Sequence, residues 1–154
     1  MRRGDRRRPS KTRYWPEKRW AAVLRGLRAI HPEHALLLTG VAPEAPLNDQ
    51  ILALAAVSGA YNLAREMTAP RLMALTERAV GMISVDTGPA HVAATIGCPV
   101  VALFDSASKV IMYAPRGPRR SAHCLTGPPG GAPSLLGITP EQVLAAWRSI
   151  VGYH

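Results

Sequence analysis

The chain has 154 residues, 47% of them hydrophobic, and a formal net charge of +9 at pH 7. This length suits one domain with a hydrophobic core and is short for two, and no run of about 18 apolar residues marks a membrane span. The excess charge is local, because residues 1–28 hold 11 of the 19 lysines and arginines and only two acidic residues, while the remainder carries eight of each sign.

We therefore expect residues 1–12 to form a solvated basic arm, followed by a single domain over residues 13–154. The arm has few aromatic residues to stack on bases, so nucleic acid is not favoured as a partner, whereas peripheral contact with acidic membrane lipids stays open. No apolar segment follows its arginines, and the two cysteines form no C-x-x-C pair. These features indicate a cytoplasmic protein with no metal site, at most resting on the inner face of the inner membrane.

Taken in chain order, the apolar pattern predicts helices that alternate with short apolar strands. An amphipathic helix begins near Pro16, and Thr139 is a good N-cap for the last helix. After Phe104 the apolar residues no longer follow a helical or strand pattern, and the composition of Thr126–Pro133 is typical of a loop. We predict strands at residues 35–39, 61–63, 81–85 and 99–104, and helices at 16–30, 47–58, 70–79, 88–97 and 139–151.

This alternation predicts an α/β fold with a Rossmann-like parallel sheet and helices on both faces. In such sheets ligands bind beyond the carboxyl ends of the strands. Three segments fall at that edge, namely residues 40–44, 62–68 and 86–91.

The sequence ISVDTG, residues 83–88, allows two chemistries. It matches the signature of aspartic proteases, in which two such aspartates share a proton, and a single copy would require a homodimer. Against a protease, Pro89 follows the glycine, the next residues have helical character, and three-residue motifs recur by chance. We therefore keep the protease only as a lesser alternative.

The other interpretation is a strand that ends at Asp86 and a helix that begins at Thr87–Pro89. A helix N-terminus binds phosphate readily, and Gly88 lets a ligand approach the backbone closely. Asp86 suits sugar hydroxyls better than phosphates, and His91 lies on the same helical face as Thr87. The simpler alternative is that Asp86 or Thr87 caps the helix and that His91 packs.

The segment MISVDTGPAHVAATIGCPVVALF closely resembles the C-terminal signature of the family 9 glycosyltransferases, the ADP-heptose:lipopolysaccharide heptosyltransferases. The segments RYWPEKRWAAVLRGL, LLLTGVAPE and NLAREMTAPRLMALTERA are similar to three further motifs of that family, in the same order. The resemblance covers about residues 13–117. It implies the C-terminal, donor-binding half of a GT-B fold, with ADP-heptose as the substrate and no cofactor.

The resemblance also implies roles for individual residues in binding the donor. Glu44 binds the ribose hydroxyls, and Met67 lies against the adenine. Arg13 stands where the family has a phosphate-binding lysine. Around the sugar and the pyrophosphate the family places the residues at Asp86, Thr87, Gly88 and His91: Asp86 holds sugar hydroxyls with His91 beside it, and the backbone of Thr87 and Gly88 binds the pyrophosphate.

The chain departs from the family pattern in ways that bear on catalysis. The family's N-terminal domain, which supplies the acceptor site and the general base, has no counterpart in these residues, and the first strand and turn of its C-terminal domain are replaced by the arginine-rich start. After Phe104 stands Asp105 instead of glycine, which is unfavourable near phosphates unless Lys109 or Arg116 offsets its charge. We expect a donor-binding domain that is truncated or works with a separately encoded acceptor domain; the alternative is a non-catalytic nucleotide-sugar-binding or interaction module.

Overall fold

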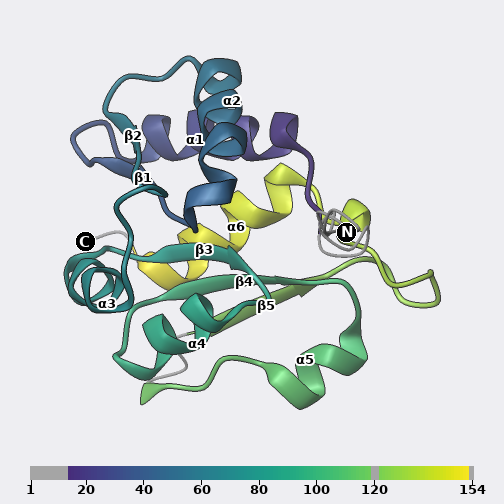
Figure 1. Ribbon diagram of the computed structural model, residues 1–154. Helices are drawn as coiled ribbons and strands as arrows, with labels where there is room; N and C mark the ends of the chain where they lie inside the picture. The colour runs from purple at the N-terminus through teal and green to yellow at the C-terminus, as the bar shows by residue number, and fades with distance from the viewer. Residues whose placement is uncertain (1–13, 119–121, 153–154) are drawn as a thin grey trace, which may run out of the picture.

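The computed structural model describes residues 14–118 and 122–152, so the expected basic arm and Arg13 lie outside the described residues (Figure 1). The strands are β1 (Leu36–Leu38), β2 (Ala60–Asn62), β3 (Met82–Val85), β4 (Val100–Phe104) and β5 (Ala122–Thr126). The helices are α1 (Glu17–Ile30), α2 (Ala45–Ala55), α3 (Ala69–Arg78), α4 (Gly88–Thr95), α5 (Ala107–Tyr113) and α6 (Pro140–Val151), with single 3-10 turns at η1 (Ala42–Glu44) and η3 (Leu135–Gly137). None of the described helices is long and apolar enough to cross a membrane.

Local signals account for where the helices begin and end. At α6 the Thr139 hydroxyl accepts from the Gln142 N–H and the Gln142 side chain accepts from the Thr139 N–H, a reciprocal capping box. At α3 the Thr68 hydroxyl accepts from the Arg71 N–H. The predicted second helix begins two residues earlier than expected and ends three residues earlier, because Ala56 takes a left-handed conformation, φ 50°, that stops α2.

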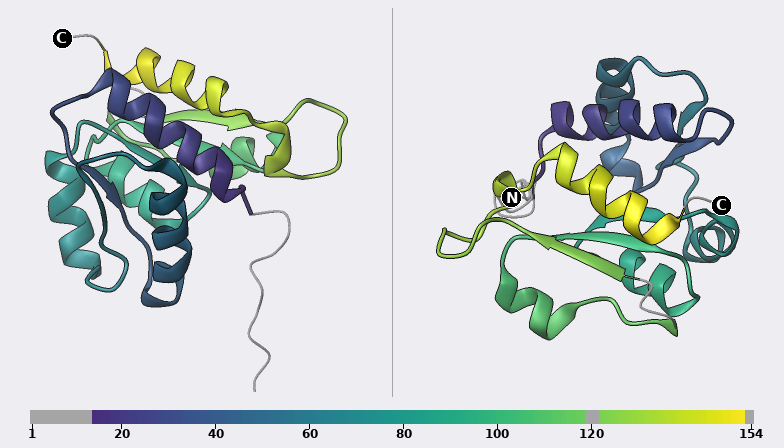
Figure 2. Two further views of the ribbon diagram at one scale, coloured as in Figure 1. Left: turned by 90° about the horizontal axis from the view of Figure 1, so that it is seen from above. Right: turned by 180° about the vertical axis from the view of Figure 1, so that it is seen from behind.

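The five strands are parallel throughout, as predicted, and form two sheets, β1–β2 and β3–β4–β5. Figures 1 and 2 show α1, α2 and α6 on one side of the three-stranded sheet and α4 and α5 on the other. This confirms the predicted α/β class with helices on both faces.

The central strand β4 divides the core into two layers, because its side chains alternate between the faces. Val101 and Leu103 pack with the apolar sides of α1 and α6, while Val100, Ala102 and Phe104 pack with the alanines of α4. All five residues of β4 are fully buried. The core therefore sits on both sides of β4 and holds the start of α4 against the end of β3.

The segment after Phe104 contains two elements that the sequence pattern did not predict, α5 and β5. Helix α5 leaves its last three apolar residues largely exposed, so it carries no amphipathic pattern: these are Ile111, Met112 and Tyr113. Among the described strands β5 pairs with β4 alone, and none of its residues is fully buried. The loop predicted at Thr126–Pro133 overlaps β5 at Thr126, and its remaining residues follow the strand.

Candidate functional site

The predicted site residues follow the carboxyl ends of three parallel strands. Glu44 follows β1, Met67 follows β2, and the segment 86–91 follows β3. Because the strands within each sheet run parallel, such segments gather at one edge of a sheet, where α/β proteins bind ligands. The described site therefore has three parts, one after each of these strands.

The part after β3 brings Asp86 and His91 together. The Asp86 N–H donates to the Leu103 carbonyl at 3.1 Å, which ties the end of β3 to β4. Its side chain is 17% exposed, and Oδ1 lies 3.8 Å from Nε2 of His91, whose side chain is 43% exposed. The end of β3 and the first turn of α4 thus place a largely covered carboxylate beside a partly exposed imidazole.

Thr87 occupies the N-cap position of α4, yet its side chain does not cap the helix. Its hydroxyl donates to the Val85 carbonyl at 3.3 Å and lies 3.1 Å from the Ser84 hydroxyl. Gly88 is exposed, and a Cβ atom built on it would meet nothing within 4 Å. The first turn of α4 is therefore open to an anion at the end where the helix carries partial positive charge.

These contacts bear on two alternatives left by the sequence, the simple helix cap and the protease. Thr87 is not simply a cap, because its hydroxyl is turned back toward β3. Asp86–Gly88 also leads from a parallel strand directly into a helix. The nearly all-β surroundings of an aspartic protease motif are absent from the described residues, so the protease alternative finds no support.

The part after β1 is a tight turn built on Gly40. Gly40 has φ +148°, and a Cβ atom on it would overlap Oε2 of Glu44. The same oxygen accepts from the Val41 N–H at 2.9 Å. A glycine is therefore needed both for the backbone and for the close approach of the carboxylate. The Glu44 side chain is held in one place while the residue stays exposed.

A network of two asparagines, which the sequence patterns did not indicate, links the turn after β1 to the turn after β2. Buried Asn48 of α2 donates to the Thr39 carbonyl at 3.1 Å and to Oδ1 of Asn62 at 3.2 Å. Asn62 donates in turn to the Ala45 carbonyl at 2.9 Å, and its Oδ1 accepts from the backbone N–H of the turn after β2. The network joins the turn that carries Glu44 to the turn that carries Met67. The only sequence signal was an asparagine at the end of a strand.

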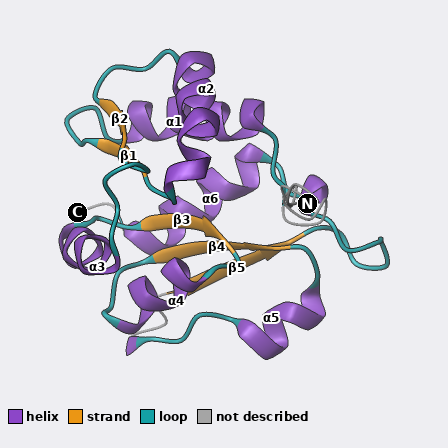
Figure 3. Ribbon diagram, in the orientation of Figure 1, coloured by secondary structure: helices purple, strands orange, loops and turns teal. Residues whose placement is uncertain are grey.

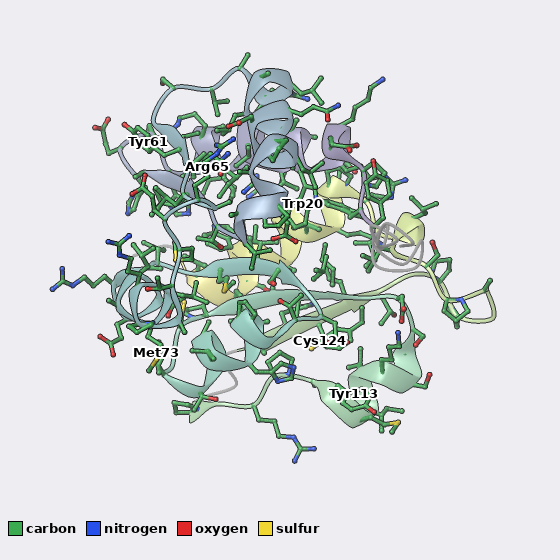
Figure 4. The ribbon with its side chains drawn as sticks, in the orientation of Figure 1. Trp20, Tyr61, Arg65, Met73, Tyr113 and Cys124 are labelled. Atoms are coloured by element: carbon green, nitrogen blue, oxygen red, sulfur yellow. The ribbon has the colours of Figure 1, made fainter. Side chains whose placement is uncertain are left out.

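The third part of the site, the turn that carries Met67, lies between β2 and α3, and Met67 is half-buried. Arg65 in the same turn forms an ion pair with Asp49 at 3.5 Å, and both side chains are more than half exposed. Figure 4 shows Arg65 beside Tyr61 of β2, at the end of the molecule away from α5. The asparagine network thus connects the turn of Glu44 with the turn of Met67, and the Asp86 carboxylate lies 3.8 Å from the His91 ring. Arg13 lies outside the described residues.

Asp105, at the carboxyl end of β4, carries the extra negative charge that the sequence placed near the site. Lys109, in the first turn of α5, offsets it: Nζ lies 2.6 Å from Oδ2. Within the described residues this is the ion pair of Asp105, and Arg116 takes no part in it. The other oxygen, Oδ1, is buried without a hydrogen-bond partner among these residues.

Two further observations concern the cysteine thiols and metal binding. Burial raises the pKa of the Cys124 thiol, and the negative charge of Asp86 raises it further; burial also raises the pKa of Cys98. Both cysteines are free thiols, and their raised pKa values make them poor nucleophiles. Among the described residues no three histidine, cysteine or acidic side chains are grouped to hold a metal ion.

Residues 6–128 match the model of glycosyltransferase family 9 (heptosyltransferase). The fold is similar to ADP-heptose LPS heptosyltransferase II of E. coli, with a TM-score of 0.73 and 25% identity over 92% of this chain and 43% of that one. It is also similar to a family 9 glycosyltransferase of Veillonella parvula, with a TM-score of 0.75 and 20% identity over 94% and 44% of the two chains. E. coli heptosyltransferase WaaC, solved with ADP, gives a TM-score of 0.70 and 20% identity over 88% and 39%.

The chain thus spans about two fifths of the length of these solved structures, which are GT-B glycosyltransferases. No curated protein matches the sequence.

Proposed function

Because the chain belongs to glycosyltransferase family 9, we propose that it is the donor-binding domain of a sugar transferase. Its ligand is an ADP-linked sugar, ADP-heptose by the family resemblance, which is transferred with inversion to a lipopolysaccharide-core acceptor. The observation that carries this proposal is the open first turn of α4, where exposed Gly88 follows the Asp86 carboxylate and precedes His91.

Each part of the site has a task in this proposal. The backbone N–H groups at Thr87 and Gly88 bind the diphosphate, because the N-terminus of α4 is positive and unobstructed. Asp86 accepts hydrogen bonds from sugar hydroxyls, and His91 donates to the sugar or to a phosphate oxygen. In the neighbouring turns Glu44 binds the ribose hydroxyls.

Two further contacts complete the donor site. Met67 lies against the adenine, where a soft apolar side chain suits a ring face. Arg13 contributes positive charge to the phosphates. Lys109 keeps the charge of Asp105 from opposing them, because the two groups are paired at 2.6 Å.

In the reaction, an oxygen of the acceptor forms a bond to the anomeric carbon while the bond from that carbon to ADP breaks. The electron pair of the broken bond leaves with the diphosphate, and a general base takes the proton of the acceptor hydroxyl. The positive end of α4 stabilises the charge that develops on the diphosphate. We assign the base and the acceptor site to a separate acceptor domain, because Asp86 is used to hold the sugar.

Isothermal titration of the full chain with ADP tests the donor site. We expect Gly88→Ala to weaken ADP binding at least tenfold with little change in stability, since its methyl group would enter the space in front of α4 and clash with nothing in the protein. The matched control is Gly131→Ala, whose Cβ atom would lie 3.7 Å from its nearest neighbour, the Pro128 carbonyl. Glu44→Ala, Asp86→Ala and Arg13→Ala should also weaken binding. If ADP binds all four variants as it binds the unmodified chain, the site assignment is wrong.

The second candidate is a non-catalytic nucleotide-sugar-binding module. It is favoured by the described site, in which each group that we assign binds the donor and none is assigned as the base. Sugar transfer assayed with the chain alone and then with an added acceptor domain separates the two. A transferase domain gives activity in the mixture that Asp86→Ala abolishes, whereas a binding module gives ADP affinity and no transfer in either assay.

A further inference from the structure

The end of helix α5 carries the two most exposed large apolar side chains of the described residues. Ile111 is 80% exposed and Met112 is 67% exposed, and Tyr113, which follows them in the chain, is 50% exposed. Single exposed apolar residues are common on protein surfaces and need no explanation. Three in a row form a contiguous apolar surface, and such surfaces mark contacts with other molecules or with membranes.

Helix α5 is anchored before and after these residues, so their exposure follows from the way the helix packs. In its first turn Lys109 pairs with Asp105 at 2.6 Å, and Val110 packs against the core layer on the α4 side of β4. At its end the Ala114 N–H donates to the Val110 carbonyl at 3.0 Å, and the following Pro115 is buried. The residues between these anchored positions therefore project away from the core.

The three exposed side chains leave the helix in different directions. Consecutive residues of an α-helix are about 100° apart, so the three together cover roughly 200° around the end of α5. A protein partner would have to enclose this end in a matching pocket, and three side chains offer far less than the roughly 1,000 Å² of a specific protein interface. A fluid apolar medium surrounds all three without a matching shape.

The charge next to this apolar surface is positive. Arg116 is exposed, forms no ion pair with a described residue, and follows Tyr113 by three residues, which is at most about 11 Å of chain. Residues 106–140 of the sequence include four lysines and arginines and no acidic residue. The nearest acidic residue before them, Asp105, is neutralised by Lys109. Apolar side chains with basic neighbours are typical of surfaces that bind anionic lipid headgroups.

The same features argue against two other occupants. In a symmetric dimer the surface would meet itself, which would bring Arg116 of one copy toward Arg116 of the other. Nucleic acid gains little, because Tyr113 is the only phenylalanine, tyrosine or tryptophan in residues 106–140 that could stack on a base. At a membrane the same tyrosine is well placed, since its apolar ring and polar hydroxyl suit the level of the headgroups.

We propose that Ile111, Met112, Tyr113 and Arg116, which we call the α5 surface, form a peripheral contact with a bilayer that contains anionic phospholipid. Ile111 and Met112 enter the boundary between the headgroups and the acyl chains. Tyr113 lies at the level of the headgroups, and Arg116 pairs with lipid phosphate. All four residues belong to the folded domain, so this contact is separate from any that the basic arm makes.

The contact brings the candidate donor site to the membrane. Helix α5 follows the end of β4, at the same edge of the sheet at which Asp86 follows β3 (Figure 3). The Asp86 N–H donates to the Leu103 carbonyl of β4, which ties the two strand ends together. A lipid-linked acceptor then meets the donor at the membrane surface. This consequence rests on the proposed function, whereas the membrane contact itself does not.

Cosedimentation of the full chain with vesicles tests the contact. The vesicles contain equal parts of phosphatidylglycerol and phosphatidylcholine, or phosphatidylcholine alone. We expect the double variant Ile111→Ser with Met112→Ser to bind the anionic vesicles at least tenfold more weakly, because both apolar side chains that enter the bilayer are lost. Arg116→Gln should weaken binding to the anionic vesicles about fivefold.

The matched control is Tyr61→Ser, which removes an aromatic side chain that is 55% exposed at the opposite end of the molecule from Tyr113 (Figure 4). It should leave vesicle binding unchanged. The residues changed in all these variants are exposed, so urea unfolding followed by circular dichroism should give the same stability for each variant as for the unmodified chain.

The measurement is made without ADP, so that its result is independent of the donor site. Equal binding of the unmodified chain and the double serine variant would overturn the proposal; if replacing Arg6, Arg7 and Arg8 by glutamine then abolishes binding, the basic arm is the contact. Equal binding to neutral and anionic vesicles would also overturn it. If the chain binds no vesicles and sedimentation shows a dimer that Ile111→Ser disrupts, the surface is an interface between two copies and the proposed occupant is wrong.

Discussion

Removing the ammonium group of Lys109 should expose the cost of the carboxylate buried at the end of β4. The Asp105 side chain is 3% exposed, and its only ion pair among the described residues is with Lys109 at 2.6 Å. At that distance and an effective dielectric constant of about 20 the attraction is roughly 6 kcal/mol before the cost of desolvation. Because the Lys109 side chain is 33% exposed, water reaches the pair. We therefore expect Lys109→Met to lower the free energy of unfolding by about 3 kcal/mol, the lower end for a broken buried pair.

Urea unfolding at pH 7, followed by circular dichroism, measures this loss against an internal control. Arg65 and Asp49 also form an ion pair, at 3.5 Å, but their side chains are 61% and 54% exposed. Arg65→Met should therefore cost below about 0.5 kcal/mol. The double variant Asp105→Ala with Lys109→Met should regain most of the loss, since it leaves no buried charge unpaired. Equal costs for Lys109→Met and Arg65→Met would refute the reasoning.

Three further predictions concern packing, pH and the asparagine network. Gly81→Ala should cost about 1–3 kcal/mol in urea unfolding, because its Cβ atom would lie 2.8 Å from the ring of Trp147. Burial lowers the pKa of His31, which accepts from the Trp147 indole at 2.9 Å, so the unfolded chain takes up a proton first. The free energy of unfolding should therefore fall as the pH drops below about 6.5, and less so in His31→Gln. Asn62→Ala should cost about 1–3 kcal/mol and weaken ADP binding, because it leaves the buried amide of Asn48 short of an acceptor; unchanged ADP affinity would contradict a positioning role.

Most of the individual elements could be predicted from the sequence, because their signals are local. Helical spacing predicted α1 and α3, a threonine cap predicted the start of α6, and the apolar run of β4 predicted a buried strand. Helix α5 and strand β5 could not be predicted, since neither buries one full face and their apolar residues follow no period. The resemblance to family 9 likewise lies in contiguous motifs, and the family comparison confirms it.

In the candidate site, too, some features could be predicted from neighbouring residues and others depend on packing between distant segments. The strand-to-helix turn at Asp86–Gly88 could be predicted from neighbouring residues, and the structure adds that Asp86 lies 3.8 Å from His91. The roles of Glu44, Met67 and Arg13 in binding the donor stay predictions. The link between the turns could not be predicted, because Asn48 and Asn62 meet only when α2 packs beside β2.

The sequence by itself determined the order and type of most elements, because capping, turn residues and apolar periodicity act over a few neighbouring residues. Only the tertiary structure decided which groups are paired at long range: the partner of Asp105, the asparagine network and the division of the strands into two sheets. A strand's apolar sequence shows that it is suited to an inner position, whereas the strands that flank it are set by chain segments far away. For that reason β1 and β4 are both apolar, yet among the described strands β1 pairs with β2 alone and β4 pairs on both sides.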